Sequence, residues 1–272
     1  MTKSNQNIVN ILRADDISVF LSLWLKNRSI LSSESNAVFS KYYQSYLRYF
    51  GPYIMHQYKQ QSKELMEYIE QNPTLKVLEI GCGCGTESLW MALHGINVTS
   101  IDINEERLSV ANERKQLLED SLGKTLPVEF HLQSILEMEE IEFDVIWMEQ
   151  TFHHLEPREE VLSTLYKLLK KGGKIIISDT NALNPLVQLQ YFLQRGFKTV
   201  KKVRGYVYGN ERVTTPRLLK RKMDKYGFNN IVYRYFRIMP NKRFVDLLKF
   251  NEPKLCRPLT FLYTHYNIIA NK

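Results

Sequence analysis

The stretch KVLEIGCGCGT, residues 76–86, decides the fold of this chain. Residues 77–80 are a short, mostly apolar run of the kind that forms a buried strand. The run passes directly into three glycines at alternate positions, and a segment of helix-forming residues follows. Glycine has no Cβ, so the backbone can turn sharply at these positions and approach a ligand closely. The stretch therefore predicts a strand, a ligand-binding loop and a helix in direct succession.

Outward from this loop, short apolar runs alternate with helical segments. The runs are typical of buried strands and occupy residues 77–80, 98–101, 128–132, 145–148 and 175–177, with two more near 231–236 and 262–270. The other segments carry helix start and stop signals and occupy residues 86–94, 104–119, 157–171 and 215–226. This alternation predicts an α/β fold with a Rossmann-like, doubly wound sheet of seven mostly parallel strands and helices on both faces. Ligands of such sheets bind at the carboxyl ends of the strands.

The rest of the chain divides into two additions to this core. Residues 7–70 carry spaced apolar positions and a cluster of tyrosines, which predicts helices. We expect an N-terminal helical cap at residues 1–60 and the main domain at residues 61–272. Within that domain the alternation pauses at residues 180–214, which are rich in Arg, Lys and aromatic residues, and we expect an insert there that caps the substrate.

The composition favours a compact protein with no membrane span. The chain has 272 residues, 44% of them hydrophobic, which is enough for one full core with additions. No run of about 18 apolar residues occurs, so we expect no transmembrane segment. The most apolar early stretch, residues 17–25, follows two aspartates instead of a basic leader, and we interpret it as one face of a helix. We expect a cytoplasmic protein.

The three cysteines, Cys82, Cys84 and Cys256, cannot form an even disulfide framework. A reducing compartment fits this count. The Cys82-x-Cys84 pair would need a second pair or a nearby His-x-x-x-His to complete a zinc site, and the sequence offers neither. We therefore expect no metal and interpret the pair as small side chains in a tight loop.

Charge is divided unequally along the chain. Residues 151–272 hold 24 Lys and Arg against 8 Asp and Glu, and residues 1–150 hold 13 against 21, so formal charges of +16 and −8 sum to the net +8. Such a split occurs in proteins with an anionic partner, whether nucleic acid, a membrane surface or an acidic substrate. More often, however, such a split is simply a solvated basic face.

Two acids give the glycine loop its specificity. Asp102 ends the next predicted strand, 21 positions beyond Gly81, where a carboxylate can accept both ribose hydroxyls of a nucleoside. Dinucleotide-binding loops space their glycines as G-x-G-x-x-G. Here the third glycine comes one residue earlier and Glu79 precedes the first, so the spacing argues against a dinucleotide.

The pattern resembles the class I S-adenosylmethionine-dependent methyltransferases of the small-molecule type. Their first motif, acid-x-Gly-x-Gly-x-Gly, is met by EIGCGCG at residues 79–85, and their second acid by Asp102. The resemblance covers roughly residues 60–272 and implies S-adenosylmethionine as cofactor and S-adenosylhomocysteine as product. It implies that the backbone of the loop, at Gly81, Cys82, Gly83 and Gly85, holds the methionine part, with Asp102 on the ribose, Ile103 on one adenine face and Glu79 organising the loop.

Two further segments extend the resemblance. The family often places a polar pair near the adenine after the third strand, and Gln133 and Ser134 occupy that place, followed by Ile135, although the Asp often found there is absent. After the fourth strand, MEQTFHHLEP at residues 148–157 resembles the paired-histidine segment of many small-molecule members. The resemblance implies that Glu149 and Gln150 line the cofactor side.

Candidate catalytic and substrate residues follow from their positions. His153 and His154 come after the fourth strand on the ligand side, and histidine titrates near neutrality, so either is a candidate general base. Four tyrosines are candidates for contact with the substrate, Tyr42, Tyr46, Tyr206 and Tyr208.

Three functions remain open. The first is methyl transfer to a small-molecule O, N or C nucleophile by in-line displacement. The second is RNA or DNA methylation by the basic half, although MEQT stands where related amino-methylating enzymes have Asn/Asp-Pro-Pro-Tyr, and no Pro-Cys pair offers a nucleophile. The third is a membrane-surface enzyme that uses residues 183–197 as an interfacial helix, or a cofactor-binding regulator. The acceptor and the oligomeric state stay open.

Overall fold

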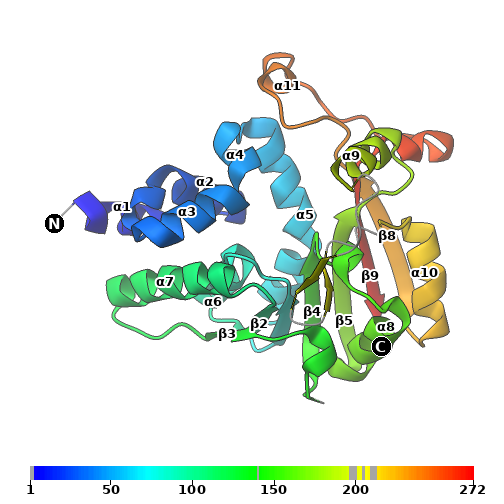
Figure 1. Cartoon of the computed structure of the whole chain (residues 1–272), viewed down its shortest axis with the longest axis horizontal. Helices are drawn as coiled ribbons and strands as arrows, with labels where there is room; N and C mark the ends of the chain where they lie inside the picture. The colour runs from blue at the N-terminus through cyan, green and yellow to red at the C-terminus, as the bar shows by residue number, and fades with distance from the viewer. Residues whose placement is uncertain (1–2, 140, 196–200, 204–205, 209–212) are drawn as a thin grey trace. The chain divides into compact units, whose positions relative to one another are not determined.

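The computed structural model describes residues 3–272 except 140, 196–200, 204–205 and 209–212 (Figure 1). Seven strands form one sheet in the order β3-β2-β1-β4-β5-β9-β8. The predicted class, a mostly parallel Rossmann-like sheet with helices on both faces, is confirmed. The chain forms two compact units, Met1–Gln133 with Asn241–Phe250, and Ser134–Pro240 with Asn251–Lys272. The expected division into a cap at 1–60 and a domain at 61–272 stays a prediction.

The first unit contains three parallel strands. They are β1 (Lys76–Ile80), β2 (Asn97–Asp102) and β3 (Val128–Leu132). Ile80 pairs with Ile101 across the first two strands, so the glycine loop that follows β1 lies beside the end of β2. The register therefore brings Asp102 to the loop.

Helices surround these strands in the first unit, and their caps explain their boundaries. They are α1 (Lys3–Leu12), α2 (Ile17–Asn27), η1 (Arg28–Ile30), α3 (Ser33–Tyr42), α4 (Gln44–Arg48), α5 (Pro52–Gln71), α6 (Thr86–Leu93), α7 (Glu105–Leu122) and α11 (Arg243–Leu247). Asp16 begins α2, since its Oδ1 accepts the backbone N–H of Ser18 at 2.8 Å. Asn104 begins α7 in the same way, through the N–H of Arg107 at 2.9 Å, and left-handed Gly123 ends it.

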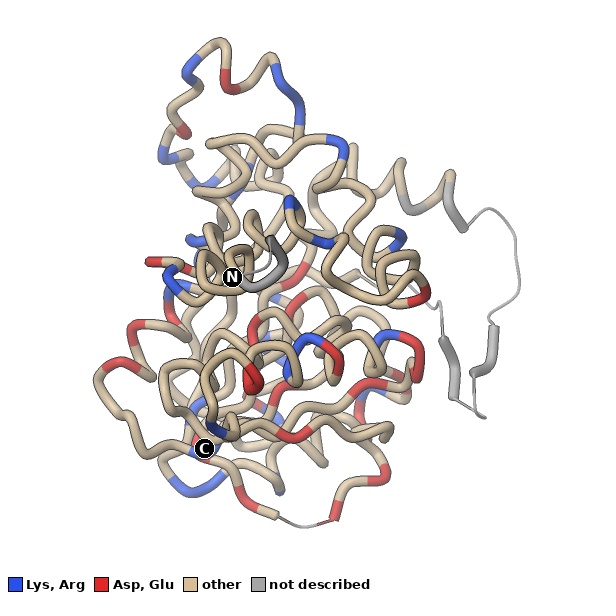
Figure 2. The backbone as a smooth tube through the Cα atoms, turned by 90° about the vertical axis from the view of Figure 1, so that its left-hand side faces the viewer, with Lys and Arg blue, Asp and Glu red and all other residues tan. Residues whose placement is uncertain are grey.

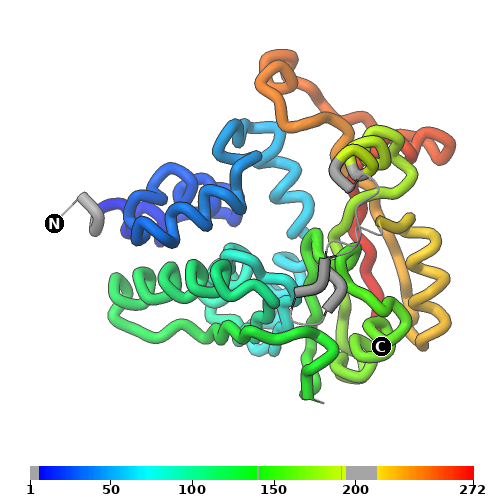
Figure 3. The backbone as a smooth tube through the Cα atoms, viewed as in Figure 1, coloured from blue at the N-terminus to red at the C-terminus, as the bar shows by residue number. Residues whose placement is uncertain are grey.

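One segment of this unit comes from far along the chain. Residues 241–250 return beside α4 and α5, as the orange and light blue parts of Figure 3 show. Asp246 fixes them there, because its Oδ1 accepts the N–H of Tyr53 at 2.7 Å.

The second unit contains the other four strands of the sheet. They are β4 (Phe143–Glu149), β5 (Leu169–Thr180), β8 (Asn229–Phe236) and β9 (His265–Asn271). β4 and β5 pair in parallel, whereas β9 pairs antiparallel with β5 and with β8. The carboxyl ends of β4 and β5 therefore lie together, and each leads into candidate site residues.

Two boundaries in this unit correct the sequence analysis. The helix expected over 157–171 ends at Leu168, because Leu169 is already buried opposite Phe143 as the first residue of β5. The strand expected over 262–270 begins at His265, because Arg257–Leu262 form the 3-10 helix η4, which Pro258 opens. The first residues of the expected strand have side chains that favour a strand. The nearby proline favours a turn, and the turn is what forms.

The remaining elements of the second unit include part of the expected insert. They are η2 (Ile135–Glu137), η3 (Phe152–His154), α8 (Arg158–Leu168), α9 (Pro185–Arg195), α10 (Pro216–Lys225) and the hairpin of β6 (Lys201–Val203) and β7 (Tyr206–Tyr208). The predicted insert at 180–214 thus includes α9 and this hairpin, and its role as a substrate cap stays a prediction. Among the described helices, none is long and apolar enough to cross a membrane.

Candidate functional site

The glycine loop has a backbone that only glycine adopts readily. Gly81, Gly83 and Gly85 have φ of 75°, 54° and 74°, all in the left-handed region. At Gly85 a Cβ would also lie 2.9 Å from the Cβ of Ala111 and from the ring of Phe130. The alternate spacing seen in the sequence is therefore required both by the turn and by the packing of α7 and β3 against it.

Asp102 ties this loop to the end of β2. One carboxylate oxygen accepts the N–H of Gly83 and the other the N–H of Asn104, both at 2.8 Å. The side chain belongs to a residue that is only 6% exposed. Two carboxylate oxygens offer about four lone-pair directions, so acceptor capacity remains for the two hydroxyls of a ribose. The residue that the sequence assigns to the ribose thus also fixes the loop, which fits a nucleoside cofactor.

Glu79 faces the opposite side of the loop. Its carboxylate accepts a hydrogen bond from the hydroxyl of Ser88, and that hydroxyl lies 2.7 Å from the hydroxyl of Ser100. All three residues are buried. This chain of contacts joins β1, α6 and β2 behind the loop.

The two loop cysteines are buried thiols. Burial raises the pKa of Cys82 well above its usual value, and burial raises the pKa of Cys84 to about 12. Both therefore stay protonated at neutral pH, whereas metals bind the thiolate. Among the described residues, no group of three or more His, Cys, Asp and Glu side chains is placed to hold a metal ion.

Tyr42 lies against the loop at Gly83. A Cβ at Gly83 would collide with the phenol oxygen of Tyr42, so the absence of a side chain there leaves room for this ring. The guanidinium carbon of Arg107 lies 4.9 Å from the centre of the same ring. Of the other predicted substrate tyrosines, Tyr46 packs edge-on against Tyr58, and the side chains of Tyr206 and Tyr208 lie outside the described part.

Arg114 is a loop residue that the sequence analysis missed. It is fully buried on α7, and its Nη1 donates to the carbonyl of Cys84 at 2.5 Å and to the hydroxyl of Thr86 at 3.0 Å. Its guanidinium lies 4.4–5.9 Å from the centres of three rings, those of Trp24, Phe39 and Phe20. Desolvation lowers the pKa of Arg114, and the rings supply a favourable electrostatic environment in place of water. The signal in the sequence was an arginine on the apolar face of a predicted helix.

The last cofactor candidates of the first unit follow the ends of β2 and β3. Ile103 is half-buried directly after Asp102. The N–H of Gln133 donates to the carbonyl of Asp102 at 3.2 Å. Both residues therefore adjoin the acid that the sequence assigns to the ribose.

Ser134 and Ile135 belong to the second unit and begin η2. The Ser134 hydroxyl accepts the N–H of Leu136 at 3.3 Å, and Glu137 in turn accepts the N–H of Ser134 at 3.0 Å. This capping box uses the serine side chain for structure. Ile135 is buried.

Glu149 ends β4, and Gln150 follows it with φ 47°, a left-handed conformation that is uncommon for a residue with a side chain. Its Oε1 accepts the hydroxyl of Thr180 at 2.7 Å. Its Nε2 is buried and has no acceptor among the described residues. A buried donor of this kind is available to a ligand.

His153 is held by a carboxylate at the end of β5. Its Nδ1 lies 2.6 Å from Oδ1 of Asp179, and both residues are buried, at 3% and 0% exposure. A carboxylate accepts, so Nδ1 carries a proton in this contact. The His154 ring packs beside it with centroids 4.0 Å apart. The sequence analysis named both histidines and missed Asp179, although an acid just after a predicted strand was the available signal.

Comparison with known proteins places these features in a family. A model of the methyltransferase domain matches residues 71–227, more than half of the chain. Phosphoethanolamine N-methyltransferase 1 of Arabidopsis thaliana is 32% identical over 142 residues, which are 50% of this chain and 28% of that protein. The ubiquinone biosynthesis O-methyltransferase of Pseudomonas putida (strain GB-1) is 31% identical over 137 residues, 46% of this chain and 53% of that one. The chain thus spans about a quarter to half of the length of these relatives.

Solved structures share the fold. The phosphoethanolamine N-methyltransferase 2 of Haemonchus contortus in complex with S-adenosyl-L-methionine has a TM-score of 0.59 at 16% identity and covers 96% of this chain and 60% of its own. The magnesium protoporphyrin IX methyltransferase of Synechocystis PCC 6803 with bound S-adenosylhomocysteine has a TM-score of 0.56 at 14% identity, covering 94% and 100%. At these identities the likeness concerns the fold.

Replacement of Asp102 tests the loop. Asp102→Ala removes the acceptor of the Gly83 N–H, which is also the acceptor that the sequence assigns to the ribose, and should weaken S-adenosylmethionine binding by about 1.5–3 kcal/mol, roughly ten- to a hundredfold in Kd by calorimetry. Asp102→Asn keeps one acceptor oxygen, so its affinity for S-adenosylmethionine should lie between those of the wild type and of Asp102→Ala. Asp120→Ala, on exposed α7 surface, is the control. Unchanged affinity in Asp102→Ala would show that the loop has been misread.

Replacement of Arg114 tests the support behind the loop. Arg114→Met leaves the buried carbonyl of Cys84 without this donor and removes one of the two contacts of the Thr86 hydroxyl, and should lower the free energy of unfolding in urea by about 3 kcal/mol. Lys115→Met, which removes only an i,i+4 ion pair with Glu119, should cost less than about 1 kcal/mol. Arg114→Lys should recover part of the loss. Equal stability of the two Met variants would contradict the role of Arg114.

Proposed function

The chain belongs to the class I S-adenosylmethionine-dependent methyltransferases, and we propose that it transfers the methyl group to an O, N or C nucleophile of a small molecule by in-line displacement. The observation that carries the proposal is the buried pair of His153 and Asp179, because the carboxylate fixes the orientation of a ring that can act as a base. A nucleophile that carries a proton needs such a base.

The cofactor fits the residues already described. We assign its methionine part to the backbone of Gly81, Cys82, Gly83 and Gly85, and its ribose to Asp102. The remaining assigned residues are those at the adenine, Ile103, Gln133, Ser134 and Ile135, and those on the cofactor side after β4, Glu149 and Gln150. When bound, S-adenosylmethionine supplies a methyl group on a sulfonium, which needs little further activation.

The protein's first task is then to orient the nucleophile. Well-oriented reactants gain up to about 7–11 kcal/mol over reactants that must meet by diffusion. Tyr42 supports this task, since the phenol end of its ring lies against the loop at Gly83. We assign to Tyr42 the exclusion of water from the methyl group.

The second task is removal of the proton. His153 takes it, because the hydrogen bond from Nδ1 to Asp179 fixes the orientation of the ring. The positive charge that then forms on the ring is stabilised by the buried carboxylate. A positioned base of this kind contributes about 10²- to 10⁴-fold to the rate. His154 packs on the ring and acts as the alternative base.

The names of the relatives support a small-molecule acceptor. They give phosphoethanolamine with N-methylation, and ubiquinone biosynthesis with O-methylation. None of the proteins named above is described as acting on a nucleic acid or at a membrane surface. The atom that is methylated differs among them, so O, N and C remain in the proposal. The cytoplasmic location expected from the sequence stays a prediction.

A labelling experiment tests the acceptor class. Purified protein, S-adenosylmethionine labelled in the methyl group and a cell extract are incubated together, and the label is sorted into protein, nucleic-acid, lipid and small-molecule fractions. The small-molecule fraction should gain the label, and Asp102→Ala should reduce the gain. Label that accumulates in another fraction would replace the small-molecule acceptor by that class.

Three variants test the base, assayed on the acceptor found by labelling. His153→Ala and Asp179→Asn should each lower kcat at least tenfold, since one removes the base and the other its orienting charge. The affinity for S-adenosylmethionine should stay within twofold. His154→Ala is the matched control with the same chemical change one residue away. A loss confined to His154→Ala would make His154 the base, and full activity in all three variants would end the proposal of a histidine base.

A further inference from the structure

A cavity lies in the first unit, formed by two segments far apart in the sequence. Its volume is about 500 Å³, within the range of small-molecule sites. The end of α4 contributes Ser45, Arg48 and Tyr49, and the start of the returning segment contributes Asn241, Lys242 and Arg243. Neither segment carries a residue assigned above to the cofactor or to the base.

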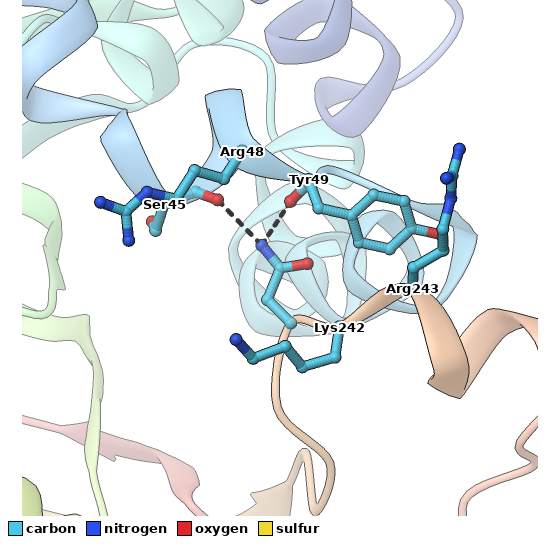
Figure 4. Close-up of a pocket in the computed structure, with 6 residues that line it drawn as sticks. Ser45, Arg48, Tyr49, Lys242 and Arg243 are labelled. Carbon is cyan, nitrogen blue, oxygen red and sulfur yellow. Dashed lines mark hydrogen bonds between the residues drawn. The ribbon is translucent and has the colours of Figure 1, made fainter.

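The frame of the cavity is fixed by hydrogen bonds (Figure 4). The amide nitrogen of Asn241 donates to the carbonyls of Ser45, at 3.2 Å, and Tyr49. The Tyr49 phenol donates to Asp246 at 2.5 Å, and this hydrogen bond raises the pKa of Tyr49, which therefore stays protonated. Because Asp246 also accepts the N–H of Tyr53, both of its oxygens are occupied by neutral donors.

Three exposed basic side chains line the cavity. No described carboxylate forms an ion pair with Arg48, Lys242 or Arg243. In Figure 4 the side chains of Arg48 and Lys242 extend to the same side of the cavity, and Arg243 lies beyond the ring of Tyr49. The Lys, Arg, Asp and Glu positions are marked along the backbone in Figure 2. Cations with no acidic partner at one cavity attract an anion.

The cavity also offers one unused acceptor. Since both hydrogens of the Asn241 amide are directed at carbonyls, its Oδ1 is fixed in orientation. That oxygen is buried and has no donor among the described residues. A buried acceptor without a donor is rare in folded proteins, because it costs free energy that a ligand can restore. The ligand must therefore carry a hydrogen-bond donor as well as negative charge.

From these groups we infer that the cavity binds the phosphomonoester end of a small molecule that also carries a hydroxyl or ammonium group. A phosphomonoester has close to two negative charges at neutral pH, which match Arg48 and Lys242, and guanidinium recognises its oxygens in a fork. The hydroxyl or ammonium donates to Asn241. A simple carboxylate carries one charge and no donor, so it satisfies only part of the site.

This inference deepens the proposed function by naming the chemical class of the methyl acceptor. It rests on the proposed function only in taking the phosphomonoester to be part of that acceptor. α4 follows α3 directly, and α3 ends at Tyr42, which lies against Gly83. The anion cavity and the cofactor loop are therefore carried by neighbouring parts of one unit. A molecule held by its phosphate at α4 is positioned by the same helices that cover the loop.

Calorimetry on the full chain tests the cavity with glycerol 3-phosphate as the probe. The wild type should bind this probe at least tenfold more tightly than sulfate, which lacks a donor for Asn241, and should show no binding of glycerol. The double variant Arg48→Gln/Lys242→Gln should lose at least tenfold in affinity. Lys41→Gln/Lys249→Gln removes the same number of charges outside the cavity, one from α3 next to α4 and one from the returning segment, and should change affinity less than twofold.

Three results would overturn the inference: equal affinity for sulfate and glycerol 3-phosphate, equal losses in the two double variants, or absence of binding by the wild type at millimolar probe. The affinity for S-adenosylmethionine is measured in every variant and should stay unchanged, which excludes misfolding as the cause of a loss.

The link to methyl transfer is tested on the labelled product. Phosphatase treatment should release the labelled small molecule from an anion-exchange column. A labelled product that phosphatase leaves unchanged would refute the phosphorylated acceptor and leave small-molecule methyl transfer standing. Absence of any labelled small molecule would instead refute the proposed function, whatever the cavity binds.

Discussion

The hydrogen bond from the Gly83 N–H to the Asp102 carboxylate is the contact on which the rest of the site depends. It joins the middle of the glycine loop to the end of the neighbouring strand. The left-handed torsion at Gly83 aims the N–H at the acid, and the parallel register of β1 and β2 brings the acid within reach. A single buried carboxylate therefore orders the loop before any nucleoside binds, so that less conformational entropy is lost on binding.

The loop is also supported from the side of the N-terminal helices. Arg114 binds the carbonyl of Cys84 and lies among aromatic rings of α2 and α3. A cation in such a place is expensive to desolvate, and the rings and the two acceptors offset that cost only in this arrangement. The helices that precede the sheet are therefore part of the cofactor loop's support, in addition to any role above the substrate.

The second unit contributes chemistry by the same principle, since a strand end carries an acid that orients its neighbour. Asp179 at the end of β5 orients His153, which follows β4. The anion cavity repeats the principle with an amide, because Asn241 is oriented by two carbonyls and keeps one acceptor free. In each place a buried hydrogen bond sets the direction in which a polar group faces a ligand.

By itself the sequence determined the strand, loop and helix at residues 76–94, the alternation that makes the sheet, and the place of Asp102, because these depend on local periodicity and on glycine's backbone freedom. It also indicated the two histidines, but could not tell which of them has a carboxylate partner. Only the tertiary structure decided that Asp179, 26 residues away, lies against His153, that Arg114 turns inward to Cys84, and that Asn241 meets Ser45 across 196 residues. The physical reason is that such contacts are fixed by the packing of whole elements, by strand register and by the burial of charge. None of these produces a repeating pattern of residue types that could be recognised in the sequence.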